Sequence, residues 1–424
     1  MIDTGKINKH NQEILSPHTK DLDYLKVKVG EDKSNEIIDK LRAFQVAIPS
    51  WALGAGGTRF GRFSIGGEPA TIYEKLDDIG IIHALTQSAG AVSLHIPWDI
   101  PDDAEKVKRH ASDLDITFDA VNSNTFQDQN GQPLSYKFGS LSHVQKLTRQ
   151  QAIDHNKEVI DIGRALGSQS LTVWLADGSS FPGQLNFRKA LENTKTSLSE
   201  IYGHLPDDWK MYIEYKPYEP YFYSTVIQDW GTSLMLAEAC GDKAHTLVDL
   251  GHHLPNTNIE QIVATLMYKG RLGGFHFNDS KYGDDDLTVG SIKPYQLFLI
   301  FNELVYGMDN NPSNNPDLAW MIDASHNLKD PLEDLMQSID AILIAYAQAL
   351  MVDRSSLEQA REYNDVSLAQ EILHEAYRSD LRPFVREARS IAGGAIDPIG
   401  VYRKAEVRKK LIDKRGSGSR ATGL

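Results

Sequence analysis

Short runs of apolar, β-branched and aromatic residues recur through the middle of the chain, separated by segments with helical spacing or loop composition. Such runs are typical of buried strands, and their alternation with helical crossovers, such as 149–166 and 188–203, indicates a parallel sheet. Eight units favour closure of the sheet into a (β/α)8 TIM barrel, an α/β fold. The eight runs are Phe44–Trp51, Val92–Pro97, Phe118–Asn122, Ser170–Leu175, Lys210–Tyr215, His245–Asp249, Gly273–Phe277 and Ala319–Asp323.

The two ends of the chain have a different pattern. Residues 1–43 are polar and charged with weak helical periodicity, which predicts an N-terminal arm or one or two surface helices. After residue 330 the apolar spacing is helical to about residue 413, which is more helix than the last crossover needs. We therefore predict a catalytic barrel over 44–330, a helical C-terminal extension over 331–413 and a flexible tail over 414–424.

Composition narrows the choice of partners and compartment. The chain has 424 residues, and 44 Lys plus Arg against 58 Asp plus Glu give a net charge of −14, which disfavours nucleic acid as a partner. The single cysteine, Cys240, excludes an intramolecular disulfide and fits a reducing compartment. The first residues lack a signal-peptide pattern, and no apolar run is long enough to span a bilayer. We expect a cytoplasmic protein with no membrane partner.

Polar residues of catalytic type follow almost every predicted strand. The carboxyl ends of the strands share one face of a (β/α)8 barrel, and active sites are built at that face. Three further candidates follow soon after strand ends, namely His252 after the sixth strand and Asp284 and Asp286 in a glycine-containing loop after the seventh. The residues at or beside the strand ends are His95, Asn122, Asp177, Glu214 with Lys216, Asp249, His276 and Asp323.

The acidic members of this set predict a metal site. Five carboxylates brought together would carry a charge of −5, and neighbouring carboxylates cannot all stay ionised without compensation. Two divalent cations would reduce the charge to −1, whereas one would leave −3, so two are the better fit. His252 and His276 would be neutral ligands, and Asp249 could bridge both ions. The alternative is that these residues are helix caps and turn formers. The carboxylates are Glu214, Asp249, Asp284, Asp286 and Asp323.

The remaining candidates surround this predicted metal site. His95 ends the second strand and is interpreted as catalytic, although a lone histidine on a strand is often a satisfied core residue. Lys216 shares a face with Glu214, so it would contact a substrate oxygen or simply neutralise that glutamate. Asp323, besides ligating a metal, is counted among the catalytic residues. The predicted pocket wall consists of Trp98, Trp174, Phe126 and Ser325. Trp174 could equally pack in the core.

Longer strings in the sequence carry a family resemblance. The stretches Ser93–Trp98, Leu247–His253, Gly274–Asp286 and Met321–Asn327 resemble the bacterial L-rhamnose isomerases, in particular the broad-specificity branch that also acts on D-allose and D-psicose. The spacing of the acidic and histidine residues is similar to the two-metal site of xylose isomerase-like barrels in general. The likeness runs from about residue 44 to about residue 402.

The resemblance implies a role for each matching residue. Glu214, Asp249, His276 and Asp323 would hold a structural ion, and Asp249, His252, Asp284 and Asp286 would hold a catalytic ion. The family's usual metal is Mn2+, with Co2+, Mg2+ or Zn2+ as alternatives. His95 would assist ring opening and Lys216 would contact a substrate oxygen. The family is homotetrameric, and Phe60 would complete a neighbour's pocket.

These implications predict an aldose–ketose isomerase that converts L-rhamnose to L-rhamnulose, and D-allose to D-psicose. A 1,2-hydride shift after ring opening is favoured over an enediol route, because a cation-bound carboxylate is a poor base. Three alternatives stay open at this point. They are a ketose 3-epimerase, a metal-dependent hydrolase on the same barrel and a sugar-binding barrel without activity.

Overall fold

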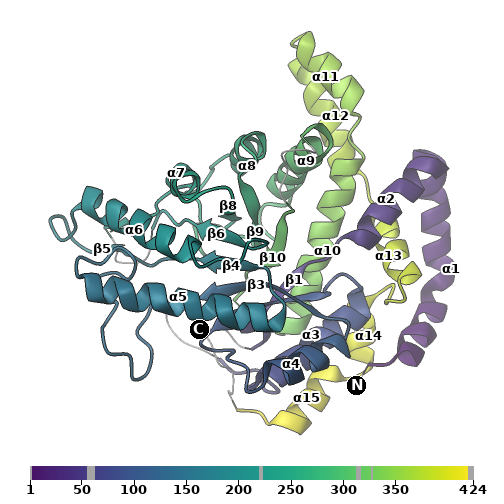
Figure 1. Ribbon diagram of the computed structural model, residues 1–424. Helices are drawn as coiled ribbons and strands as arrows, with labels where there is room; N and C mark the ends of the chain where they lie inside the picture. The colour runs from purple at the N-terminus through teal and green to yellow at the C-terminus, as the bar shows by residue number, and fades with distance from the viewer. Residues whose placement is uncertain (1, 55–62, 219–222, 312–316, 326–327, 419–424) are drawn as a thin grey trace.

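A closed barrel of eight parallel strands forms the centre of the protein (Figure 1). The computed structural model describes residues 2–54, 63–218, 223–311, 317–325 and 328–418. Around the barrel the strand order is β1-β10-β9-β8-β6-β4-β3-β2, and each of the eight predicted runs supplies one strand. The predicted (β/α)8 fold is confirmed. The strands are β1 (Ala47–Pro49), β2 (Ala91–Ile96), β3 (Thr117–Ser123), β4 (Ser170–Val173), β6 (Lys210–Glu214), β8 (Ala244–Asp249), β9 (Leu272–Phe277) and β10 (Ala319–Ile322).

Helices follow the barrel strands in turn and cover the outside of the barrel (Figure 1). Several begin at a short polar side chain that accepts a backbone N–H of the first turn, as Asp103, Asn186 and Asp229 do. The helices are α3 (Ile72–Thr86), α4 (Ala104–Ser112), α5 (Lys146–Leu166), α6 (Phe187–Tyr202), α7 (Trp230–Cys240), α8 (Ile259–Tyr268), α9 (Pro294–Asn310) and α10 (Pro331–Leu350). A short 3-10 helix, η1 (Ser50–Leu53), leaves β1.

The barrel strands are buried on both faces, which explains their nearly continuous apolar sequence. Their outward side chains pack under the helices, and Phe275, Phe277, Phe301 and Trp320 form one stack of aromatic rings there. A separate apolar cluster of strand residues includes Ala47, Ala120, Leu247 and Met321, whereas carboxylates and histidines gather at the carboxyl ends of the strands. The polar end of the barrel is therefore the face that can hold a site.

The N-terminal residues form two long helices, α1 (Thr4–Val29) and α2 (Glu31–Ala43). They lie beside the C-terminal helices (Figure 1), since Asn11 donates to the carbonyl of Gly394 at 3.0 Å and accepts from the N–H of Ile396 at 2.9 Å. His18 also lies 2.9 Å from a carboxylate oxygen of Glu387. The chain therefore closes on itself, with segments nearly 400 residues apart in contact.

The C-terminal extension consists of five helices after α10, and the first two form a hairpin that projects from the barrel (Figure 1). The base of the hairpin packs on α9 through Tyr377, whose ring lies 4.8 Å from that of Tyr295. These helices are α11 (Arg354–Glu362), α12 (Val366–Arg378), α13 (Arg382–Ile391), α14 (Pro398–Lys404) and α15 (Val407–Arg415).

The last helix differs from the flexible tail expected over 414–424. Arg415 ends α15 and is buried, and its guanidinium donates to Asp78 at 2.7 Å and to the carbonyls of Gly67 and Glu74 at 3.1 Å. The expectation is wrong at Arg415 because a polar, glycine-rich sequence gives no sign of a buried acidic partner on α3. Residues 419–424 lie outside the described part of the chain.

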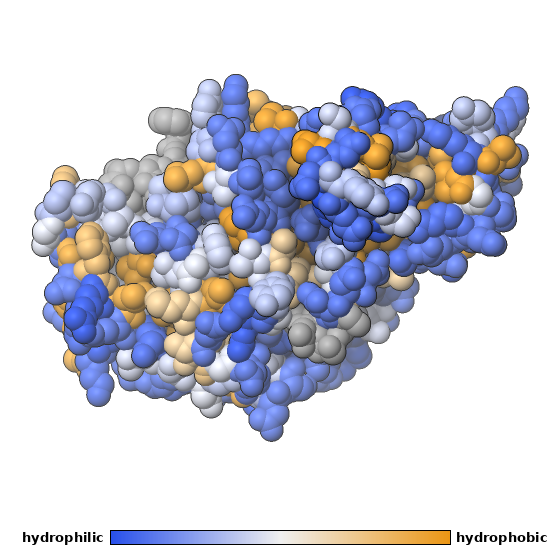
Figure 2. Space-filling view, turned by 90° about the horizontal axis from the view of Figure 1, so that it is seen from above, coloured by the Kyte–Doolittle hydropathy of each residue, from blue (hydrophilic) through white to orange (hydrophobic). Residues whose placement is uncertain are grey.

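The surface seen in Figure 2 is mainly hydrophilic, with apolar side chains in separate patches. Within the described residues, no single helix is long and apolar enough to cross a membrane, although α10 and α11 together, bent by 63°, meet the length and composition requirement.

Candidate metal centre and active site

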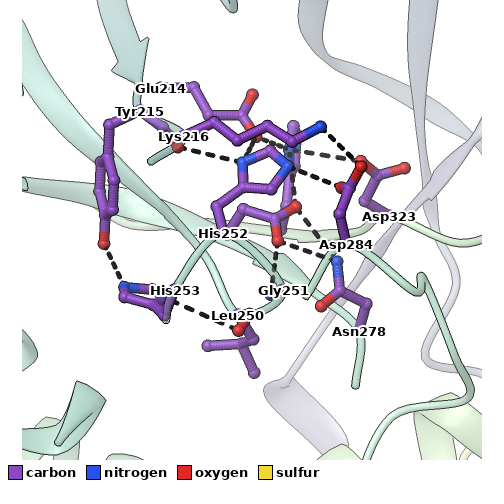
Figure 3. Close-up of polar contacts among 12 residues, drawn as sticks. Glu214, Tyr215, Lys216, Leu250, Gly251, His252, His253, Asn278, Asp284 and Asp323 are labelled. Carbon is purple, nitrogen blue, oxygen red and sulfur yellow. Dashed lines mark hydrogen bonds and ion pairs between the residues drawn. The ribbon is translucent and has the colours of Figure 1, made fainter. Parts of the chain in front are cut away.

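The carboxyl ends of four consecutive barrel strands bring together one histidine and three carboxylates, of which Glu214 and Asp323 are labelled in Figure 3. Glu214 ends β6, Asp249 ends β8, His276 lies in β9 and Asp323 follows β10. From Nδ1 of His276, the nearest oxygens of Glu214, Asp249 and Asp323 lie at 3.2, 3.8 and 4.0 Å. These four side chains are the ones expected to hold the structural ion, and the barrel register places them around one point.

His252 supplies a second nitrogen on the other side of the same carboxylates. Its Nδ1 lies 3.2 Å from Oε1 of Glu214, and its Nε2 lies 3.0 Å from Oδ1 of Asp284. Two sets, Glu214 with Asp249 and His252, and Asp249 with His276 and Asp323, each have ligand atoms within 4.8 Å of one another. Asp249 belongs to both sets, as its predicted bridging role requires.

Asp284 and Asp286 come from the loop after β9, which folds back over the barrel end. Both residues have left-handed backbone conformations, with φ of 51° and 46°. The N–H of Asp284 donates to the carbonyl of Gly251 at 3.0 Å, and the carbonyl of Asp286 accepts from the N–H of Ser325 at 3.3 Å. These bonds connect the loop to the segments that follow β8 and β10, so both predicted ligands join the cluster.

The charge of this cluster fits divalent cations. Five carboxylates meet here. The ammonium group of Lys216 contacts one of them, at 2.6 Å from Oδ2 of Asp284. Oδ1 of Asp286 and Nε2 of His276 are buried and have no hydrogen-bond partner among the described residues. Oxygen-rich sites with imidazole nitrogens suit Mn2+, Mg2+ and similar ions. The residues present therefore fit the predicted two-cation site.

The histidine pKa values respond to the surplus of negative charge. Burial alone would lower the pKa of His276, but Glu214 and the two neighbouring aspartates raise it to about 9. Burial would also lower the pKa of His252. The carboxylates of Asp249, Asp284 and Glu214 nevertheless raise this pKa well above its usual value. Both imidazoles are thus held as cations in the metal-free protein. A bound metal ion would replace these protons.

The carboxylates divide according to their partners. Burial raises the pKa of Asp249 to about 6, with Glu214 and Asp323 adding to the effect. Burial, followed by the charge of Asp284, raises the pKa of Asp286 well above its ordinary value. For Asp284, the bonds from His252 and Lys216 outweigh burial and lower the pKa. Like charges this close cannot all ionise without cations.

Two supporting residues were not assigned a role from the sequence. Asn278 donates to both carboxylate oxygens of Asp249, at 3.0 and 3.1 Å, and the N–H of Gly251 donates to one of them at 2.7 Å. Trp51 donates from Nε1 to Asp323 at 2.8 Å. Such bonds orient metal ligands. Asn278 could have been found, because it lies two residues after His276 and so on the same side of an extended chain. The contact of Trp51 has no such signal.

Lys216 lies between the carboxylates and the aromatic wall. Its Nζ is 5.1 Å from the centre of the Trp174 ring, a cation–π distance. Its backbone is fixed on both sides, since Lys216 N donates to Ile227 and Lys216 O accepts from Thr225, at 3.0 and 2.6 Å. The prediction that Glu214 and Lys216 point to one side agrees with their contacts. Trp174 thus faces the site.

His95 lies among aromatic rings at the end of β2. Its ring centre is 4.2 Å from Trp98, 5.4 Å from Trp51 and 5.5 Å from Phe126, and the Phe126 ring continues to Trp174 at 4.8 Å. Burial lowers the pKa of His95 to about 3, so the imidazole is neutral near pH 7. A neutral imidazole can both donate and accept a proton.

The backbone of His95 is supported by a buried ion pair. Asp99 accepts from the N–H of His95 at 2.9 Å and from Ser50 and the ammonium of Lys75 at 2.5 Å each. Both charged side chains are almost fully buried, with exposed fractions of 3% for Lys75 and 1% for Asp99. This network connects η1, α3 and the loop after β2 beneath the aromatic wall.

Some expected site residues have other roles. Asp177 accepts bonds of 2.6–2.9 Å from the backbone and hydroxyl groups of Ser140 and Ser142, so it joins two loops and lies outside the metal cluster. Asn122 donates to Ser93 and to the carbonyl of residue 94 within the barrel. The backbone N–H of Ser325 donates to the carbonyl of Asp286 at 3.3 Å. Phe60 lies outside the described residues.

Comparison with known proteins agrees with this architecture. The profile of the xylose isomerase-like TIM barrel family matches residues 83–310. A "probable sugar isomerase" of Mesorhizobium japonicum is 52% identical over 405 residues, which cover 95% of this chain and 94% of the relative. A "probable sugar isomerase" of Rhizobium meliloti is 50% identical over 421 residues, with coverage of 98% and 97%. The chain belongs to the xylose isomerase-like TIM barrel family.

Solved structures with the same fold are much more distant in sequence. A 3-keto-D-glucoside 4-epimerase from E. coli superimposes with a TM-score of 0.50 at 13% identity, covering 70% of this chain and 99% of its own. A xylose isomerase domain protein from Alicyclobacillus acidocaldarius gives 0.50 at 14% identity, with coverage of 72% and 100%. At this identity the likeness shows the shared fold alone.

Proposed function

We propose that this protein is a two-metal aldose–ketose isomerase that interconverts L-rhamnose and L-rhamnulose, and also D-allose and D-psicose. The observation that carries the proposal is the position of Asp249 in two adjoining ligand sets, each of which includes a histidine. The two half-identical relatives, both named as sugar isomerases, support the reaction class. The substrates rest on the resemblance of the site sequences to L-rhamnose isomerases.

The residues of the chain divide the work of the reaction. An aldose must open before its C1 and C2 exchange oxidation state, and His95 is a neutral, buried imidazole that can move a proton at the anomeric oxygen. The rings of Trp98 and Phe126 exclude water beside it and offer flat apolar surfaces to a sugar. Lys216 can donate to an oxygen of the opened chain.

Two cation positions follow from these residues. The inner cation would be held by Glu214, Asp249, His276 and Asp323. The outer cation would be held by Asp249, His252, Asp284 and Asp286. When bound, such cations act as Lewis acids toward the oxygens on C1 and C2. The carboxylates are then committed to ligation and are poor bases. The chain therefore favours direct movement of a hydride between the two substrate carbons over removal of the C2 proton by a side chain.

The test is an assay of metal-stripped protein before and after addition of Mn2+, with L-rhamnose, D-allose and D-psicose as substrates. Aldose–ketose conversion should appear only after Mn2+ is restored, and the ranking of the three sugars should define the preference. Exchange at C3 without aldose formation would identify an epimerase instead. No conversion of any of the three sugars by the Mn2+-loaded protein would refute the proposal.

A matched pair of variants tests the outer cation position. His252→Ala should remove one of two bound Mn2+ ions and abolish conversion, because His252 is the only imidazole in its ligand set. His204→Ala, a partly exposed histidine beside Asp161, should leave both unchanged. Full activity of the His252 variant with one ion bound would rule out the two-metal reaction.

We further expect the protein to be a homotetramer. Sedimentation velocity measures this oligomeric state.

A further inference from the structure

The three loops that follow β6, β8 and β9 meet at one backbone carbonyl. The carbonyl of Gly251 accepts from the N–H of Asp284 at 3.0 Å and from the hydroxyl of Tyr218 at 3.3 Å. Two residues before this tyrosine, Lys216 contacts Asp284 at 2.6 Å. The segment Lys216–Tyr218 therefore contacts the loop that carries two of the predicted ligands.

The contact between Tyr218 and this loop is closest at Gly283. A Cβ atom on Gly283 would lie 1.3 Å from the tyrosine hydroxyl oxygen and 2.2 Å from the adjoining ring carbon. The φ angle of Gly283 is +148°, a conformation that residues with side chains rarely adopt. The hydroxyl of Tyr218 thus occupies the space that a side chain would need, and the loop passes beneath the ring only because residue 283 is glycine.

The ligand loop needs such external support because its own conformation is unfavourable. Asp284 and Asp286 both have positive φ angles, which glycine adopts freely and aspartate only occasionally, and their carboxylates repel each other. At the base, the backbones of Asp279 and Leu287 pair through two 2.9 Å hydrogen bonds. The tip is held by its contacts with neighbouring loops, and Tyr218 is the bulky side chain that touches it at Gly283.

We propose that Tyr218 is a positioning residue that latches the ligand loop at Gly283 and holds Asp284 and Asp286 in the arrangement that binds the outer divalent cation. The inner ligands lie at strand ends and do not depend on this latch. The inference rests on the two-cation site of the proposed function, but it concerns cation affinity and not sugar conversion. It adds a residue outside the ligand sets to the determinants of that affinity.

Calorimetric titration of the metal-stripped full-length protein with Mn2+ tests the latch. In Tyr218→Ala the binding event of the outer cation, identified as the one that His252→Ala removes, should lose at least tenfold in affinity, while the other event changes less than twofold. Tyr218→Phe keeps the ring but removes the hydroxyl that lies against Gly283 and donates to Gly251 at 3.3 Å, so it should cost less affinity than Tyr218→Ala. Tyr282→Ala, a neighbouring tyrosine that is 72% exposed, is the matched control and should leave both events unchanged.

Glycine variants separate the contact with the ring from backbone strain. Gly283→Ala should abolish binding of the outer cation. Gly183→Ala should preserve it, because Gly183 also has a positive φ, +87°, but has open space around it. In the Tyr218→Ala background, the further loss of Mn2+ affinity caused by Gly283→Ala should be at least threefold smaller than the loss it causes in the parent protein. A second readout needs no metal. In the metal-free state, the amide hydrogens of residues 279–287 should exchange faster in Tyr218→Ala than in the parent protein.

Several results would overturn the latch. Unchanged affinity in both Tyr218→Ala and Gly283→Ala would do so, as would equal weakening of both binding events or strictly additive effects of the two substitutions. A parent protein that binds fewer than two Mn2+ ions would refute the latch together with the two-cation site. Two binding events without conversion of any sugar would refute only the proposed function, and the affinities of the variants would still decide the latch.

Discussion

The hydrogen bond from Trp51 to Asp323 offers a quantitative test of how the barrel end supports the proposed metal centre. Nε1 of Trp51 donates to Oδ1 of Asp323 at 2.8 Å, and the ring also lies edge-on to His95 and His276. Trp51→Phe removes the donor and keeps most of the apolar ring. The carboxylate then loses a partner that favours its ionised, metal-binding form.

The size of the effect follows from the geometry. A hydrogen bond to a charged group contributes about 1.5–3 kcal/mol. Because 21% of the Asp323 side chain is exposed, water can replace part of this bond, so we take the lower end of the range. With about 1.4 kcal/mol for each tenfold change, Mn2+ affinity at the inner position should fall about tenfold. This agrees with the 10–100-fold loss (roughly) that is typical when a partner of a metal ligand is removed.

Calorimetry of metal-stripped protein with Mn2+ measures this loss directly. The control is Trp320→Phe, since Trp320 stacks on Phe275 and Phe277 on the outer side of the barrel, away from the metal cluster. The control should bind Mn2+ as the parent protein does. If Trp51→Phe bound Mn2+ within twofold of the parent while His276→Ala lost an ion, the bond would not support the ligand and the reasoning would be refuted.

Three further predictions concern protons and stability. Mn2+ affinity at the inner position should fall about tenfold for each pH unit below 9, because the proton on His276, whose pKa is about 9, competes with the cation. Calorimetric titration with Mn2+ at several pH values between 6.5 and 8.5 measures this change. An affinity that does not vary with pH would contradict the prediction. His95→Ala should lower kcat about 100-fold or more with Mn2+ binding unchanged, measured by steady-state kinetics and calorimetry. Arg415→Ala leaves the buried carboxylate of Asp78 unpaired, so it should lower the free energy of unfolding by about 3–5 kcal/mol. The control Arg188→Ala removes an exposed ion pair and should lower it by less than about 1 kcal/mol. Equal unfolding midpoints of the two variants would disprove a structural role of α15.

The fold and the main candidate ligands could be predicted from the sequence because both depend on periodicity. Apolar runs of strand length recur with helical segments between them, and a closed parallel barrel brings all carboxyl ends of its strands to one face. Residues such as Glu214, Asp249 and His276 therefore converge whatever the details of the loops. The order of the elements is enough to place them.

Other parts of the site depended on the tertiary structure. Trp51 reaches Asp323, Tyr218 covers Gly283 and Asp78 receives the guanidinium from the end of α15 only because particular loops follow particular paths. Asp177 has the position of a catalytic residue in the sequence, yet its carboxylate is used by the loop that follows β3.

The physical reason is the range of the interactions. Strand and helix patterns follow from neighbouring residues and from burial, which the sequence itself records. A hydrogen bond between residues 51 and 323, or an ion pair between residues 78 and 415, requires two distant backbones to be within a few tenths of an ångström of the right positions. By itself the sequence determined the barrel and the residues at its polar end, and the tertiary structure decided which neighbours hold them in place.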